Sequence, residues 1–137
     1  MIRDIIHNET FLRRPSVPAT RRDRRVAEDL LDTLKAHAVD CAGLAANMIG
    51  VSKCVIAVRI GSRALAMLNP EILHHAPTAY EAEEGCLSLS GTRKALRYKW
   101  IEVRYRDEKF RPQQERFTGF PAQTIQHEID HTKGILI

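Results

Sequence analysis

The 137-residue sequence lacks the features that mark membrane, disulfide-rich and repetitive proteins. Its longest apolar run, CVIAV at 54–58, is far shorter than the ~20 residues that cross a bilayer. Three cysteines are odd in number and too few for a disulfide framework, so each one is interpreted singly as core filler, reactive thiol or metal ligand. They are Cys41, Cys54 and Cys86. No internal repeat, low-complexity tract or linker is found.

The first ten residues, MIRDIIHNET, also lack the long apolar core and the small-residue cleavage site of a signal peptide. Asp4 and Glu9 argue against a transit peptide, which is normally poor in acids. We therefore expect a cytoplasmic protein without a membrane segment. The composition, 44% hydrophobic and 28% charged, is typical of a globular protein, and the length predicts one domain over residues 1–137.

Arginines are concentrated near one predicted helix and contribute to the formal net charge of +4. Two interpretations are open: a solvated helix face, or an electrostatic footprint for a ribosome surface or nucleic acid. No aromatic residues interleave the arginines to suggest base stacking, so no specific nucleic-acid sequence is expected as a partner. The cluster consists of Arg13, Arg14, Arg21, Arg22, Arg24 and Arg25.

Residues 20–38 predict an amphipathic helix near the N-terminus. Thr20 and Asp23 resemble a capping box, and apolar residues then recur every four positions, with a second row that widens the stripe. The apolar positions are Val26, Leu30, Leu34 and Ala38, widened by Ala27 and Leu31.

Short runs with apolar residues predict a sheet after this helix. We predict strands at 54–58, 64–68, 101–106 and 113–118. Gly61 and Ser62 separate the first two strands, as in a hairpin or meander, and Asn69 and Pro70 are expected to end the second.

The last predicted helix begins near Pro121 and runs to about residue 132, where Lys133 and Gly134 close it. One side of it carries Ala122, Ile125 and Ile129, and the nearly opposite side carries His127 and His131. Both sides are specialised, so we expect the helix to be buried centrally. One helix, several strands and one helix predict an α+β fold, with mainly antiparallel sheets packed around this C-terminal helix.

The central helix contains the H-E-x-x-H spacing in QHEIDH, residues 126–131. Histidines four residues apart lie on one face of a helix and can hold one cation, and Glu128 can reach a water on that cation. This pattern predicts metal-assisted hydrolysis. A catalytic metal usually takes three protein ligands, so a third donor is needed. The candidates are carboxylates, Cys86, His7, His37, His74 and His75.

Cys86 lies in EEGCLSLSG, residues 83–91, where Gly85 permits close backbone approach. We expect a tightly constrained segment there rather than a regular strand, and a thiolate in it would be a strong ligand. His74 and His75 follow a strand and precede Pro77, so we interpret them as loop residues that do not bind the metal.

Three motifs occur in the order GLAA (43–46), EGCLS (84–88) and QHEIDH (126–131), and together they resemble the signatures of peptide deformylases over almost the whole chain. The resemblance implies one deformylase-like domain and a metal held by Cys86, His127 and His131. That metal is usually Fe²⁺, although Zn²⁺ and Ni²⁺ accept the same ligands. The implied substrates are N-formylmethionyl nascent peptides, from which the formyl group is released as formate.

The resemblance also implies roles for other residues. Glu128 would transfer the proton between water and the departing amine, and the backbone N–H of Leu87 would donate to the oxyanion. We expect substrate contacts from Gly43, Leu44, Met48, Arg93 and Ile125.

The first motif departs from the family pattern G-x-G-L-A-A-x-Q, because CAGLAANM has Cys41 for the first glycine and Met48 for the glutamine that donates to the oxyanion. A thioether cannot donate a hydrogen bond. Asn47 could supply an amide, or Leu87 and the metal could act alone at a cost of ~100-fold or more in rate. Alternatively, the protein could be a metal-dependent peptidase or amidase with another substrate, or a catalytically weak or silent metal-binding protein.

Overall fold

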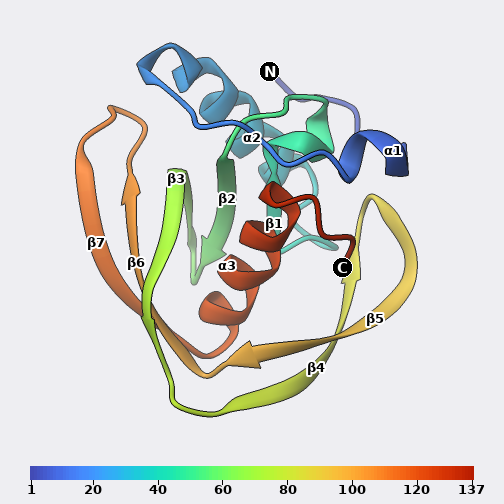
Figure 1. The fold of residues 1–137 in the computed structure, drawn as a ribbon. Helices are drawn as coiled ribbons and strands as arrows, with labels where there is room; N and C mark the ends of the chain where they lie inside the picture. The colour runs from blue at the N-terminus through green and yellow to red at the C-terminus, as the bar shows by residue number, and fades with distance from the viewer.

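The computed structural model describes residues 1–137 (Figure 1). Its α-helices are α1 (Glu9–Leu12), α2 (Arg24–Ala36) and α3 (Gly119–Thr132), and its 3₁₀ helices are η1 (Arg21–Asp23) and η2 (Ala46–Ile49). Its strands are β1 (Gly43–Ala45), β2 (Val55–Ile60), β3 (Arg63–His75), β4 (Ala79–Cys86), β5 (Leu89–Tyr98), β6 (Trp100–Arg106) and β7 (Pro112–Thr118).

The strands form two antiparallel sheets around α3. The larger sheet has the order β1-β2-β3-β6-β7, and β4 and β5 pair only with each other. In Figure 1, α3 lies in the hollow of the curved strands, and it contacts β1, β2 and β7 of the larger sheet as well as β5. The predicted α+β class, with antiparallel sheets and a C-terminal helix, is confirmed. No helix in the structure is both long and apolar enough to span a membrane.

Both specialised sides of α3 are buried. Ala122, Ile125 and Ile129 belong to the hydrophobic core, and His127 and His131 are at most 6% exposed. A helix that packs between two sheets is covered on more than one side, which explains why both its apolar and its histidine-bearing sides are buried.

The N-terminal helix starts later than its sequence suggests. The capping box of Thr20 and Asp23 is present, with the Thr20 N–H donating to Asp23 Oδ2 over 2.7 Å, but it begins the 3₁₀ turn η1. The α-helical residues are Arg24–Ala36, and Leu30 and Leu34 on the apolar side are fully buried.

The prediction that Asn69 and Pro70 end a strand is wrong. β3 continues to His75, and its register with β6 shifts between Leu68 and Glu71. Asn69 has φ 54°, which places it in the left-handed region, and its side-chain amide pairs with both backbone groups of Ala19 at 2.7 and 2.9 Å. The pair therefore makes a β-bulge rather than a strand end.

Two further predictions about this part of the chain are wrong. His74 and His75 are strand residues, not loop residues, and both are exposed. The segment around Cys86 is regular hairpin: β4 ends at Cys86, Leu87 and Ser88 form the turn, and β5 follows. Only the last step is irregular, since the register shifts between Gly85 and Cys86.

Candidate metal centre

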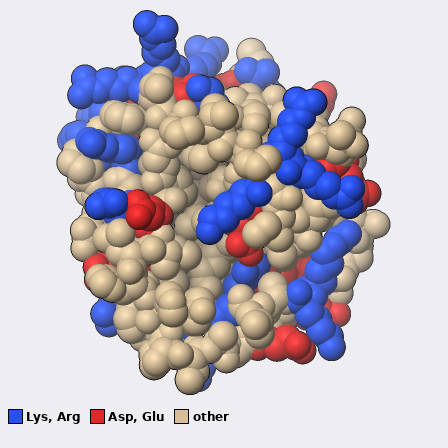
Figure 2. Space-filling view, in the orientation of Figure 1, with Lys and Arg blue, Asp and Glu red and all other residues tan.

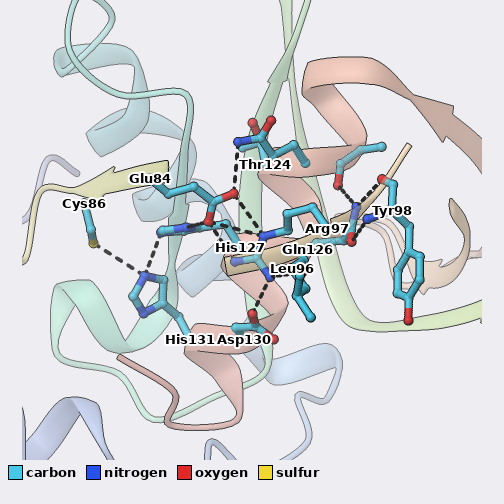
Figure 3. Close-up of polar contacts among 12 residues, drawn as sticks. Glu84, Cys86, Leu96, Arg97, Tyr98, Thr124, Gln126, His127, Asp130 and His131 are labelled. Atoms are coloured by element: carbon cyan, nitrogen blue, oxygen red, sulfur yellow. Dashed lines mark hydrogen bonds and ion pairs between the residues drawn. The ribbon is translucent and has the colours of Figure 1, made fainter. Parts of the chain in front are cut away.

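Three side chains that could bind a metal converge where β4 ends beside α3. The ligand atoms of Cys86, His127 and His131 all lie within 4.8 Å of one another. His131 Nε2 lies 3.4 Å from Cys86 Sγ and 3.0 Å from His127 Nε2 (Figure 3). One sulfur and two imidazole nitrogens that face a common point are the donor set that zinc, ferrous iron and nickel accept. The residues therefore fit a bound metal ion.

His127 is oriented by a carboxylate behind it. Its Nδ1 lies 2.8 Å from Oε1 of Glu84, a buried residue of β4 two positions before Cys86. A proton on Nδ1 satisfies this contact and leaves the Nε2 lone pair directed at the cluster. Burial raises the pKa of Glu84, but hydrogen bonds from His127 and Arg97 outweigh it and lower the pKa to about 2.

Arg97 of β5 joins the hairpin to α3. Its guanidinium donates to Glu84 over 2.7 Å from Nη2 and to Asp130 over 2.7 Å from Nη1 (Figure 3). Gln123 completes the shell, because its Nε2 donates to Glu84 Oε2 over 3.0 Å. These contacts fix the helix that carries both histidines against the strand that carries the cysteine.

The sequence did not reveal this supporting shell. Glu84 lies inside the EGCLS motif, and that position is the only signal that could have found it. Arg97 lies in the same strand as Arg93 and Lys94, neither of which is buried, and nothing in the sequence distinguishes its buried charge from theirs.

Glu128 faces the same site from α3. The side chain is buried, it lines the cavity beside the cluster, and its Oε1 has no hydrogen-bond partner in the chain. Burial raises the pKa of Glu128 to about 7, although the nearby charge of His127 opposes the shift. A carboxyl group that titrates near neutral pH can both accept and return a proton.

Gly43 of β1 allows the backbone to pass close to Glu128. A Cβ added at Gly43 would lie 2.7 Å from Thr124 Cγ2 and 3.1 Å from Glu128 Oε2. Any side chain at this position would therefore displace Thr124 or the carboxylate, so the close approach requires glycine.

A cavity of about 930 Å³ opens beside the cluster. Cys86, Leu87, His127 and Glu128 line it, together with the segment 38–43 that leads into β1. Of the predicted substrate contacts, Gly43 and Met48 also line it.

Three predicted substrate contacts lie elsewhere. Leu44 and Ile125 are fully buried in the hydrophobic core, and Arg93 is not part of the cavity wall but reaches the Ser90 carbonyl at 3.4 Å. The helical period explains the position of Ile125, because the neighbouring α3 residues Gln123 and Thr124 are turned toward the cavity.

The oxyanion donor usually supplied by glutamine has no side-chain substitute at Asn47. Its Nδ2 donates to the carbonyls of His131 at 2.9 Å and Leu12 at 3.4 Å, and Asn47 does not line the cavity. Met48 does line it, and its sulfur accepts from the Ala45 N–H at 3.5 Å. The N–H of Leu87, in the turn between β4 and β5, is engaged by no hydrogen bond outside the strand ladders.

Cys41 adds a thiol to the cavity wall where the family pattern has glycine. Its Sγ donates to the Gly43 carbonyl over 3.0 Å. Burial, helped by the charge of Glu128, raises the pKa of Cys41 to about 12, so it stays a neutral thiol at physiological pH.

Comparison with known proteins identifies the family. The family model of polypeptide deformylase matches residues 3–137. The peptide deformylase of Clostridium beijerinckii is 48% identical over 137 residues, covering 100% of both chains. That of Thermotoga neapolitana is 35% identical over 141 residues, covering 100% of this chain and 85% of its own.

Solved structures agree with this result. The crystal structure of peptide deformylase from Thermotoga maritima superimposes with a TM-score of 0.87 at 32% identity, covering 99% of this chain and 94% of that one. A class I type b peptide deformylase from Acinetobacter baumannii, crystallised with Met-Ala-Ser bound, gives 0.89 at 28% identity, covering 99% and 97%. The predicted resemblance is confirmed, and the chain belongs to the peptide deformylase family, whose members are metal-dependent enzymes.

Proposed function

We propose that this protein removes the N-formyl group from the N-terminal methionine of newly made polypeptides and releases formate. The observation that carries the proposal is that the Cys86, His127 and His131 cluster and the unpartnered carboxylate of Glu128 border one cavity in a chain of this family. Membership of the peptide deformylase family argues against the two alternatives, which were a peptidase or amidase with another substrate and a catalytically weak or silent metal-binding protein.

The three clustered residues would hold the metal, and we propose Fe²⁺, with Zn²⁺ or Ni²⁺ as ions that the same donors accept. When bound, the metal supplies Lewis acidity, which makes water a better nucleophile and polarises a carbonyl. Glu84 keeps the His127 ring in the tautomer that a metal requires, through its 2.8 Å contact with Nδ1.

Glu128 would perform the proton transfers. Its Oε1 is free of protein partners, so it can take a proton from the attacking water and deliver it to the amine nitrogen as the C–N bond breaks. The water oxygen and the formyl group leave together as formate, and the peptide keeps a free amine. The N–H of Leu87 would donate to the oxygen that gains negative charge on the formyl carbon.

The edge of β1 suggests how the peptide is held. β1 pairs only with β2, so its other edge has no partner strand in the sheet. Residues 38–43, which lead into β1, line the cavity. An extended peptide could hydrogen-bond along this edge, opposite the wall formed by residues 83–87. Phe120, Gln123 and Thr124 would then contact the methionine side chain from α3.

The place of action is also part of the proposal. We propose that residues 1–137 act as a single deformylase domain, supported by one core cluster of 25 buried residues. We further propose that it works in the cytoplasm, at or near the ribosome surface where its substrates are made.

Formate release from formyl-Met-Ala-Ser tests the function. The protein is prepared anaerobically and loaded with Fe²⁺, because thiolate and ferrous ion are both oxidisable. We expect turnover that falls about 1,000-fold in Glu128→Gln with metal content unchanged, while the exposed Glu108→Gln retains full activity. Cleavage of unformylated Met-Ala-Ser, or full activity in Glu128→Gln, would contradict the proposal.

A further inference from the structure

Three of the six arginines at residues 13–25 lie near an acidic residue, and Arg14, which has no acidic partner, lies over the Phe11 ring. Arg24 and Arg25 each lie near an acid one helical turn away, with Arg24 Nε 3.4 Å from Glu28 and Arg25 Nε 3.5 Å from Asp29. Arg13 likewise lies 3.8 Å from Glu9. These residues fit the interpretation of a solvated helix face.

Arg21 and Arg22 differ, because neither forms an ion pair with an acidic residue. Both line a surface pocket of about 750 Å³, together with Lys53 and Phe110. The single carboxylate in this pocket is that of Asp23, which already accepts the Thr20 N–H at 2.7 Å and lies 3.6 Å from Lys53 Nζ. The pocket therefore carries three cationic side chains and one carboxylate that already has partners, so its net charge is positive.

The loop between β6 and β7 holds Phe110 in an unusual conformation at this pocket. Phe110 has φ 63°, which is rare for a bulky side chain. Asp107 stabilises the loop, since its Oδ1 accepts the N–H groups of Lys109 and Arg111, both at 2.9 Å, and its carbonyl accepts from Phe110 at 2.8 Å. A conformation of this kind persists only where surrounding contacts enforce it, and such strain is common at binding sites.

The ring of Phe110 brings two guanidinium groups together. Arg106 lies 5.1 Å and Arg21 6.0 Å from the ring centroid, and Arg106 also donates to the Phe110 carbonyl over 3.2 Å. Arg106 has no acidic partner either. Gathering like charges is unfavourable in the absence of a counterion, so the arrangement suits an anion that contacts several guanidinium groups at once.

This surface lies apart from the candidate active site. In Figure 1 the start of α2 and the β6–β7 loop meet at the upper left, whereas the cluster lies between α3 and the β4–β5 hairpin. Figure 2 shows Lys and Arg side chains gathered at the same upper left end. A partner bound there would leave the cavity open to a peptide.

We propose that Arg21, Arg22, Lys53 and Arg106, arranged around Phe110, form a binding surface for the phosphate backbone of RNA. A planar guanidinium group can donate two parallel hydrogen bonds to a pair of phosphate oxygens. The open, positive pocket offers no apolar groove in which a protein segment could bind. The choice of RNA among polyanions rests on the proposed function, because polypeptides that still carry a formyl group are next to RNA while they are being made.

Two double variants with equal loss of charge test this surface. Arg21→Gln with Arg22→Gln removes the unpaired arginines, and Arg24→Gln with Arg25→Gln removes the neighbouring paired ones. Binding of a fluorescein-labelled 12-nucleotide RNA is followed by anisotropy between 50 and 200 mM KCl, with inorganic phosphate and poly-glutamate as competitors. Formate release is measured on every variant, so loss of the deformylase reaction is recognised separately from loss of RNA binding.

We expect the Arg21/Arg22 variant to lose about 10-fold or more in RNA affinity and to reduce the salt slope by roughly 0.7 for each lost phosphate contact. The Arg24/Arg25 variant should stay within about 2-fold of the wild type, and Phe110→Leu, which keeps the bulk but not the aromatic face, should be intermediate. Equal losses in both double variants, no RNA binding by the wild type, or equal competition by poly-glutamate or free phosphate would each overturn the proposal.

Discussion

The two walls of the candidate active site differ in how completely their polar groups are supported. On the wall made by α3 and the β4–β5 hairpin, His127 contacts Glu84, and Arg97 ties Glu84 to Asp130. On the wall made by residues 41–49, which include β1 and η2, Met48 stands where the family pattern has an amide donor, and Cys41 stands where it has a glycine. The metal-binding side of this chain is therefore fully supported, and under the proposed function its oxyanion side would depend on the N–H of Leu87.

The largest effect is expected from breaking the supported wall. Arg97→Met leaves Glu84 and Asp130 without their buried partner and should lower the free energy of unfolding by about 3–5 kcal/mol. Arg104→Met removes an equally short but exposed ion pair with Glu71 and should cost about 0–1 kcal/mol. Denaturant unfolding measures both, and similar losses in the two variants would show that the Arg97 network has no special role.

A smaller effect is expected from Gly43→Ala, which forces the two walls apart. The new Cβ would clash with Thr124 Cγ2 and press on Glu128, so kcat should fall ~100-fold with metal content unchanged. Adding Thr124→Ser removes the clashing Cγ2 and should restore part of the rate. Thr124→Ser alone, which removes the same methyl group without adding a Cβ at Gly43, is the matched control. Undiminished turnover in Gly43→Ala would contradict the close approach.

The smallest effect in this series is expected from Asn47→Ala. The variant removes the amide that donates to the His131 carbonyl, and an unpaired buried carbonyl costs about 1–3 kcal/mol. We expect a lower thermal midpoint, with kcat falling less than in Gly43→Ala. Exposed Gln114→Ala serves as the control. A collapse of kcat at full metal content would instead indicate that Asn47 donates to the substrate.

The sequence indicates the residues of the candidate metal centre because most of them lie close together in the chain. Residues His127, Glu128 and His131 lie within one helical turn, and the apolar period of the same helix indicates that it is buried. The α+β class follows from the order of the elements in the same way.

Other parts of the fold depend on contacts that a pattern does not contain. β4 and β5 have few buried residues, and these include the charged Glu84 and Arg97, so their sequences lack the apolar–polar alternation that reveals a strand. The continuation of β3 through Asn69 depends on that residue binding Ala19, 50 positions away. Arg97 is buried because it forms ion pairs with Glu84 and Asp130. Ile125 belongs to the core because Gln123 and Thr124 are the α3 residues that face the cavity.

The most direct test of the difference between the two walls is the ratio of kcat/KM for Met48→Gln and the wild type on formyl-Met-Ala-Ser, both loaded with Fe²⁺. The Met48 sulfur accepts from the Ala45 N–H, so a glutamine Oε1 there could take the same bond and leave its Nε2 for the cavity. We predict a gain of about 100-fold, the size of a restored oxyanion donor. An unchanged or lower ratio at equal metal content would show that the wall around Met48 lacks nothing that an amide supplies, and would contradict the proposed difference between the two walls.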